Sequence, residues 1–167
     1  MGMVVRAVDV GSGNTKYVKK VDGDAIECAS FPSIAYRSSE PHPSWAAGDK
    51  LKTMCVPVGE LFYEVGPDVN LVADKVRVTQ LHDDYITSPE YLALLRGALR
   101  MMDVPHIDLL VVGLPVDLVR LRRSVLEKLM VGVHDVGDGK TVKVLKALTV
   151  AQPQGALVHY ASLARKM

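Results

Sequence analysis

The chain has 167 residues, of which 49% are hydrophobic and 23% charged; this is the composition of a single globular domain and excludes a disordered or collagen-like chain. Lysine and arginine total 20 and aspartate and glutamate total 19, so no overall charge attracts nucleic acid or an acidic membrane, and we expect neither contact. Two cysteines are too few for a disulfide framework, and no apolar run approaches the roughly 18 residues of a membrane span, so we expect a cytoplasmic protein.

The N-terminal segment predicts a three-stranded antiparallel meander. Residues 4–10 are apolar and β-branched, as in a mostly buried strand, and the Gly-Ser-Gly-Asn sequence at 11–14 predicts a turn. Residues 15–21 resume strand composition. The Asp-Gly-Asp sequence at 22–24 favours a tight hairpin, because Asp-Gly tolerates the positive φ that such a turn needs. Residues 25–31 are the third predicted strand.

The next segment predicts a small insertion. Residues 32–52 are rich in proline, glycine and serine, which is typical of irregular structure. Residues 54–58 and 61–65 are short apolar runs on either side of Gly-Glu and predict a second hairpin. We therefore expect residues 35–85 to form a small α+β subdomain inserted into the main fold.

Helical signals begin at Ser88-Pro89-Glu90. Serine suits the N-cap, proline is tolerated in the first turn, and glutamate favours the positive end of the helix dipole. The apolar side chains that follow share one helical face: Leu92, Leu95, Leu99 and Met102. The near-continuous apolar run at 107–113 then predicts a strand that is covered on both faces.

A second helix is predicted next, with Asp117 as its cap. Its expected buried stripe consists of Leu118, Leu121, Val125 and Leu129. Residues 131–136 and 141–150 predict two strands joined at Asp138-Gly139. A third helix is expected at residues 155–166.

This order of elements predicts an α/β fold of the ribonuclease-H-like class. In that class an antiparallel meander is continued by parallel strands, which are joined through helical crossovers. We expect the core to comprise residues 1–34 and 86–167, interrupted by the small subdomain at 35–85.

The octapeptide from Asp9 to Lys16 is the sharpest candidate for a binding site. Asp9 ends a buried strand, where a carboxylate is costly unless it meets a cation or hydrogen-bond donors. The two glycines that follow allow a close backbone approach, and successive amides in such a turn can form a nest for an anion. The pattern predicts a phosphate-binding hairpin in which Asp9 holds Mg²⁺ through water. The predicted phosphate-binding residues are Gly11, Ser12, Gly13, Asn14, Thr15 and Lys16.

The same octapeptide also fits an ordinary glycine hairpin with an exposed aspartate. It is not a Walker-type phosphate loop, because the spacing differs and the glycines lead into a strand and not into a helix. The choice between these interpretations depends on the rest of the chain.

The octapeptide resembles the first phosphate motif of the actin, Hsp70 and hexokinase superfamily. More narrowly, the chain resembles actin-like plasmid-segregation ATPases of the ParM/StbA type, especially the branch called PRTRC system protein D. Three further segments are similar to elements of that group: Tyr63–Gly66 to part of its small subdomain, Val112–Val116 to its strand-to-helix turn, and Val150–Ala156 to the segment whose side chain orients the attacking water. The four segments occur in the family's order.

The resemblance implies roles for single residues. Asp9 would act as a catalytic residue that organises Mg²⁺ and its waters, the hairpin amides would cradle the β- and γ-phosphates of ATP, and Lys16 would neutralise them. Gln154 stands where the family places the Glu or Gln that positions the hydrolytic water, and Gln152 is the alternative because Pro153 leaves the register open. An amide orients water but is a poor base, which suits phosphoryl transfer.

The resemblance also implies the first half of a Mg-ATP-dependent filament former, which would self-associate and engage a DNA-bound adaptor protein. In the family the nucleotide lies between two halves, and no second phosphate motif follows here, so we expect the isolated chain to bind ATP weakly or not at all. Two alternatives stay open. One is a non-catalytic assembly or regulatory module with the same half-fold. The other is a kinase-like member, which is disfavoured because no acidic base for a substrate hydroxyl is identifiable.

Overall fold

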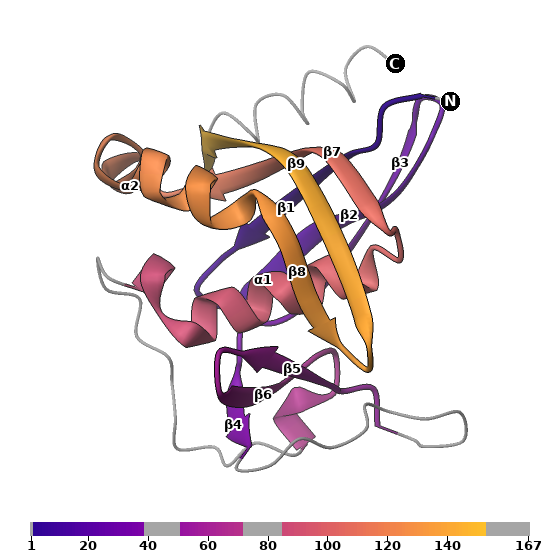
Figure 1. Ribbon diagram of the computed structural model, residues 1–167, viewed down its shortest axis with the longest axis vertical. Helices are drawn as coiled ribbons and strands as arrows, with labels where there is room; N and C mark the ends of the chain where they lie inside the picture. The colour runs from indigo at the N-terminus through magenta and orange to yellow at the C-terminus, as the bar shows by residue number, and fades with distance from the viewer. Residues whose placement is uncertain (1, 39–50, 72–84, 153–167) are drawn as a thin grey trace.

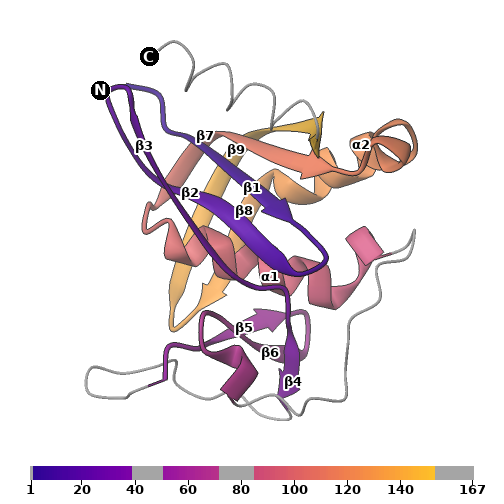
Figure 2. The ribbon, with the colours of Figure 1, turned by 180° about the vertical axis from the view of Figure 1, so that it is seen from behind.

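The computed structural model describes residues 2–38, 51–71 and 85–152. They form a six-stranded sheet in the order β3-β2-β1-β7-β9-β8 and a three-stranded sheet in the order β4-β6-β5 (Figure 1). The strands of the large sheet are β1 (Val5–Val10), β2 (Asn14–Asp22), β3 (Ala25–Pro32), β7 (His106–Leu114), β8 (Gly132–Gly137) and β9 (Lys140–Ala151). The helix α1 (Pro89–Met101) lies between the two sheets and contacts both (Figure 2).

The predicted meander is confirmed. β1, β2 and β3 are antiparallel neighbours, with Asp9 opposite Lys16 and Thr15 opposite Phe31. Gly23 turns the hairpin between β2 and β3 with a φ of +59°, a left-handed conformation that glycine adopts without steric cost.

The parallel continuation of the sheet is also confirmed. β7 runs parallel to β1, and β9 runs parallel to β7. The helices α1 and α2 (Val116–Met130) belong to the connections between these strands. β8 differs, because it pairs antiparallel with β9 and forms the edge of the sheet. The predicted α/β class is therefore observed, with one antiparallel hairpin at its last edge.

The helix α1 begins where the sequence predicts. The Ser88 hydroxyl accepts a hydrogen bond from the Tyr91 amide at 3.2 Å, and Pro89 occupies the first turn. At Gly97 a Cβ would lie 2.7 Å from Val65 Cγ2, so glycine lets the helix approach the small sheet closely. The buried residues of α1 form the centre of the core: Tyr91, Ala93, Leu94, Leu95, Gly97, Ala98 and Leu99.

The small sheet contains the predicted hairpin and one strand that the sequence analysis missed. β5 (Met54–Val58) and β6 (Leu61–Val65) pair around Gly59, whose φ is +60°. β4 (Tyr36–Ser38) adds a third strand beside β6. It has only three residues, which is too short to show the alternating pattern of a strand. Two short 3-10 helices also belong to the described residues: η1 (Val69–Leu71) and η2 (Tyr85–Thr87).

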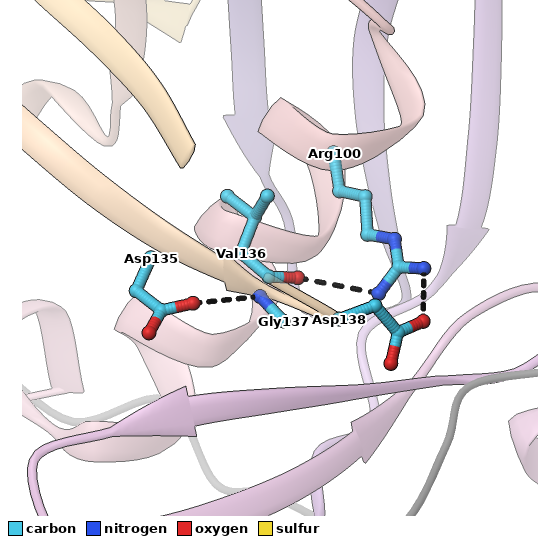
Figure 3. Close-up of polar contacts among 5 residues, drawn as sticks. All are labelled: Arg100, Asp135, Val136, Gly137 and Asp138. Atoms are coloured by element: carbon cyan, nitrogen blue, oxygen red, sulfur yellow. Dashed lines mark hydrogen bonds and ion pairs between the residues drawn. The ribbon is translucent and has the colours of Figure 1, made fainter. Parts of the chain in front are cut away.

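Two arginines connect α1 to its neighbours, one to the small sheet and one to the hairpin formed by β8 and β9. Arg96 Nη1 donates to the Pro57 carbonyl of β5 at 2.7 Å. Arg100 Nη1 donates to the Val136 carbonyl at 3.4 Å, and its Nη2 pairs with Asp138 Oδ2 at 2.6 Å (Figure 3). The helix therefore contacts both neighbours through arginine hydrogen bonds as well as through the apolar core.

The predicted cap of α2 is wrong. The helix begins at Val116 with Pro115 as its N-cap, and no side chain makes a capping hydrogen bond. Proline fixes its own φ near the value that leads into a helix, so the chain turns here without a capping carboxylate. Asp117 lies within the first turn, where its charge favours the helix dipole.

The predicted buried stripe of α2 is also wrong in three of its four members. These three are exposed: Leu121 at 73%, Val125 at 45% and Leu129 at 38%. Leu126 and Met130 are buried instead. The Glu127 carboxylate accepts the Thr149 amide of β9 at 2.9 Å, which fixes the side of α2 that faces the sheet. Apolar residues occur on two overlapping stripes of this helix, and only one of them contacts the sheet.

No helix within residues 2–38, 51–71 and 85–152 is long and apolar enough to cross a membrane. The helix predicted at 155–166 lies outside the residues that the structure describes.

Candidate functional site

The turn between β1 and β2 is a tight hairpin. The Gly11 amide closes it by donating to the Asn14 carbonyl at 3.0 Å, and a Cβ at Gly11 would lie 2.9 Å from that oxygen. Ser12 and Gly13 form the exposed tip, with open space around Gly13. Their amides make no hydrogen bond within the described part of the chain. These two amides can therefore reach an anion, whereas the Gly11 amide is already used by the hairpin.

The hairpin rests on the residue that follows β3. The Ser33 amide donates to the Gly13 carbonyl at 3.0 Å. Thr15 is fully buried, and its hydroxyl lies 2.9 Å from the Ser33 hydroxyl. The Thr15 side chain therefore supports the hairpin from inside the fold and is not presented at the exposed tip.

Asp9 lies between two strands that bring different groups beside it. It is opposite Lys16 of β2 and Gly113 of β7, and residues paired in this way place their side chains on the same face of the sheet. Asp9 is half-buried and Lys16 is exposed. No ion pair joins them among the described residues, so neither charge is neutralised by the other on this face.

Gln152, which follows the end of β9, completes this group. Its Nε2 donates to Asp9 Oδ1 at 2.6 Å, although the two residues are 143 positions apart in the sequence. Of the two glutamines considered from the sequence, Gln154 lies outside the described residues. The structure brings the alternative, Gln152, into contact with the hairpin.

Gly113 separates Asp9 from Gln152, and the sequence analysis did not select it as a site residue. A Cβ at this position would lie 3.3 Å from Asp9 Oδ1 and 3.4 Å from Gln152 Cγ. The missing side chain leaves room for the two polar groups to meet across β7. A glycine near the end of an otherwise apolar, β-branched strand was the signal that could have identified it.

Tyr91 is a buried neighbour of this end of the sheet. Burial, reinforced by the negative charge of Asp9 and by Tyr85, raises the pKa of the Tyr91 hydroxyl above its ordinary value of 10. The two tyrosine rings pack edge to face, with centroids 5.6 Å apart. Tyr91 therefore stays neutral and adds no charge beside Asp9.

These groups fit a phosphate and a hydrated divalent cation. The free amides of Ser12 and Gly13 and the ammonium of Lys16 attract an anion. Magnesium usually keeps several waters and is held by one or two carboxylates together with phosphate oxygens, so the single carboxylate of Asp9 beside an anion site suits it. In the described segments, no three His, Cys, Asp or Glu side chains gather into a metal site of their own.

The fold and this hairpin define one half of a ribonuclease-H-like protein of the actin type. The family described as "Actin like proteins N terminal domain" matches residues 7–155. The chain therefore belongs to this family of actin-like proteins, and the fold class predicted from the sequence is confirmed. No curated protein sequence matches the chain.

Solved structures of actin homologues share the fold. An archaeal actin homologue, Ta0583, is 24% identical with a TM-score of 0.71, and the match covers 97% of this chain and 49% of that one. The AlfA filament bound to AMPPNP is 20% identical with a TM-score of 0.64, covering 93% and 57%. Apo ParM of pSK41 is 20% identical with a TM-score of 0.66, covering 94% and 52%. The chain thus spans about half the length of these relatives.

Proposed function

We propose that the chain is the N-terminal half of an actin-like protein that binds Mg-ATP, assembles into filaments and hydrolyses ATP. The observation that carries this proposal is the hydrogen bond of 2.6 Å between Gln152 and Asp9 beside the glycine hairpin. It joins a carboxylate suited to a hydrated magnesium ion with an amide suited to orienting water. Both lie at the same end of the sheet as the hairpin tip.

Each part of the site then has a distinct task. The amides of Ser12 and Gly13 bind the β- and γ-phosphates, and Lys16 neutralises part of their charge. Asp9 accepts hydrogen bonds from the waters of Mg²⁺, which when bound would stabilise negative charge on the phosphates. Gly11, Asn14 and Thr15 maintain the shape of the hairpin.

Gln152 is our candidate for the residue that positions the hydrolytic water, with Gln154 as the alternative. An amide is too weak a base to remove the proton of water. Phosphoryl transfer depends mainly on positioning and electrostatic stabilisation, so an amide that orients water is sufficient.

The named relatives support the ligand and the assembly that we propose. Ta0583 was solved in complex with ADP, and AlfA was solved as a filament bound to AMPPNP. We extend nucleotide binding and self-association to this chain on that likeness. We further propose a role in plasmid segregation in the cytoplasm, with a DNA-bound adaptor protein as partner and without direct contact with DNA or a membrane.

The decisive experiment measures ATP turnover and light scattering of the whole protein, in which a second half completes the nucleotide cleft. We expect Mg-ATP to raise the scattering of the unaltered protein, and Asp9→Ala to abolish turnover while the circular dichroism spectrum is retained. Asp22→Ala, at the far end of β2, is the matched control and should keep full turnover. Undiminished turnover in Asp9→Ala would contradict the assignment, and an unaltered protein without turnover would favour the non-catalytic module.

A second measurement concerns the 167-residue chain alone. It contains the phosphate hairpin but no second phosphate motif, so calorimetry should detect weak ATP binding or none. Tight binding of ATP by the monomeric chain would show that the site does not need a second half.

A further inference from the structure

The hydrogen bond between Gln152 and Asp9 fixes which way the glutamine amide points. An ionised carboxylate accepts hydrogen bonds and donates none. A glutamine amide donates from its nitrogen and accepts at its oxygen. The contact of 2.6 Å to Asp9 Oδ1 is therefore made by Gln152 Nε2. The opposite end of the amide, the Oε1 oxygen, is left as the acceptor.

This orientation depends on three neighbouring strands ending together. Asp9 of β1 is paired with Gly113 of β7, and Gly113 is paired with Val150 of β9. Gln152 lies one residue beyond the end of β9 at Ala151, and its side chain reaches Asp9 from there. The two polar side chains thus approach one another over the backbone of β7.

The middle strand carries no side chain at this point, which leaves room for the contact. A Cβ at Gly113 would stand 3.3 Å from Asp9 Oδ1, 3.4 Å from Asp9 Cγ and 3.4 Å from Gln152 Cγ. The 3.3 Å separation from Asp9 Oδ1 is tighter than most Cβ contacts, whereas the two separations of 3.4 Å are ordinary van der Waals contacts. The Asp9 carboxylate would then have to shift by a few tenths of an ångström, which would distort its hydrogen bond to Gln152.

We propose that Asp9 and Gly113 position Gln152, so that its Oε1 faces the water that attacks the γ-phosphate. Asp9 thereby has two tasks, since it orders the magnesium waters and also sets the direction of the amide. Gly113 is a positioning residue that touches neither nucleotide nor water. This inference rests on the proposed function.

The chemical step requires the amide only to accept a hydrogen bond from the attacking water. The water oxygen forms a bond to the γ-phosphorus while the bond from that phosphorus to the bridging oxygen of ADP breaks, giving ADP and inorganic phosphate. The proton lost by the water passes to the phosphate product or to solvent. Gln152 Oε1 accepts a hydrogen bond from the water and keeps no proton, so only its direction matters.

The first test is independent of ATP and uses the 167-residue chain. The sequence contains five side-chain amides, of Asn14, Asn70, Gln80, Gln152 and Gln154, so their ¹H–¹⁵N signals can all be assigned. We expect one Gln152 amide proton to lie downfield of the others because it is bonded to a carboxylate. Asp9→Ala and Gly113→Ala should each return it to the range of the other four.

Val111→Ala is the matched control, because it alters the same strand two residues earlier without touching the polar pair. It should leave the Gln152 signal in its downfield position, and well-dispersed backbone signals will establish that each variant is folded. A Gln152 signal that is unaffected by Asp9→Ala would overturn the proposal, and one unaffected by Gly113→Ala would remove Gly113 from it.

The second test separates positioning from binding in the whole protein. Because a misplaced catalytic group costs turnover and not affinity, Gly113→Ala should lower kcat for ATP about ten- to hundredfold with KM unchanged. Gly113→Ala should cause a smaller loss when it is added to Gln152→Ala than when it is made alone, because only its effect on Asp9 and the magnesium waters then remains. An unchanged kcat in Gly113→Ala would refute the positioning role even if the protein is an ATPase, whereas absence of turnover in the unaltered protein would refute the proposed function itself.

Discussion

At the residue scale, His134 is a buried polar side chain whose hydrogen-bond partner is the backbone. It is 4% exposed, and its Nε2 lies 2.7 Å from the Met130 carbonyl at the end of α2. Since a carbonyl only accepts, Nε2 carries the proton. The buried Nδ1 has no hydrogen-bond partner in the described part of the chain. The neutral ring therefore donates to a carbonyl at the helix end, and a second proton at Nδ1 would be buried without a hydrogen-bond acceptor.

The pH dependence of stability follows from this environment. Burial lowers the pKa of His134, the Met130 hydrogen bond opposes that change, and the charge of Arg96 adds to it. The unfolded chain therefore binds a proton at a higher pH than the folded chain. The stability that the neutral His134 ring contributes is fully present above the unfolded pKa of about 6.5. It is lost as the pH drops below that value, by about 1.4 kcal/mol for each unit of pKa difference.

We expect urea unfolding between pH 7.5 and 5 to show this loss in the unaltered chain and a flatter profile in His134→Gln. His106→Gln is the control, because the His106 side chain is 51% exposed and water can solvate both forms of its ring. An equally steep profile in His134→Gln would assign the acid sensitivity to other groups.

Residue-scale prediction from the sequence succeeded where the signal was local. Asp9 and the glycine hairpin were identifiable because a strand end and a tight turn occupy adjacent positions. The contact with Gln152 depends instead on the register of β9 against β7, which is set by packing far along the chain. For this reason the sequence favoured Gln154 with Gln152 as the alternative, and Gly113 was not selected.

At the scale of elements, the sequence predicts the helix α2 correctly but predicts the wrong face of it to be buried. Its sequence contains two overlapping apolar stripes, and the hydrophobic period alone cannot tell which one meets the sheet. The choice is made by tertiary contacts, namely the burial of Leu126 and Met130 and the hydrogen bond from the Thr149 amide to Glu127. The hydrogen bonds from Thr149 and Arg123 outweigh the effect of burial and lower the pKa of Glu127, so it stays ionised in this contact.

A pair of leucines on α2 tests this assignment. Leu126 is fully buried, and Leu126→Ala should destabilise the chain by about 2–5 kcal/mol because it removes packed methyl groups and leaves a cavity. Leu121 is 73% exposed, and Leu121→Ala should change stability by no more than about 0.5 kcal/mol. Urea unfolding of both variants measures the difference. Equal losses would mean that the stripe predicted from the sequence is buried after all.

At the scale of the whole molecule, the sequence predicts the order of the elements better than their contacts. The meander and the crossovers follow from turn signals and from the alternation of strands with helices. The position of β8 at the edge of the sheet, and its contact with β5 of the small sheet, involve residues about 80 positions apart. Such contacts are set by how α1 packs between the sheets.

The last prediction concerns the contact between β8 and β5. Gly137 and Gly139 both have a positive φ, but their surroundings differ. Gly137 has a φ of +90° and Gly139 a φ of +72°, so alanine is strained at both positions. A Cβ at Gly137 would overlap the Cys55 carbonyl of β5, whereas one at Gly139 would have nothing within 4 Å.

We expect Gly139→Ala to cost about 1–2 kcal/mol from backbone strain alone, and Gly137→Ala roughly 2–4 kcal/mol because it also forces β8 away from β5. Urea unfolding gives the two costs, and hydrogen exchange shows where the structure opens. Faster exchange in β5 should accompany Gly137→Ala only, since the Gly139 variant leaves this contact intact. Equal costs and equal exchange in the two variants would mean that the small sheet is held by α1 alone, through contacts such as the hydrogen bond from Arg96 to Pro57, and that the approach of Gly137 to Cys55 contributes nothing.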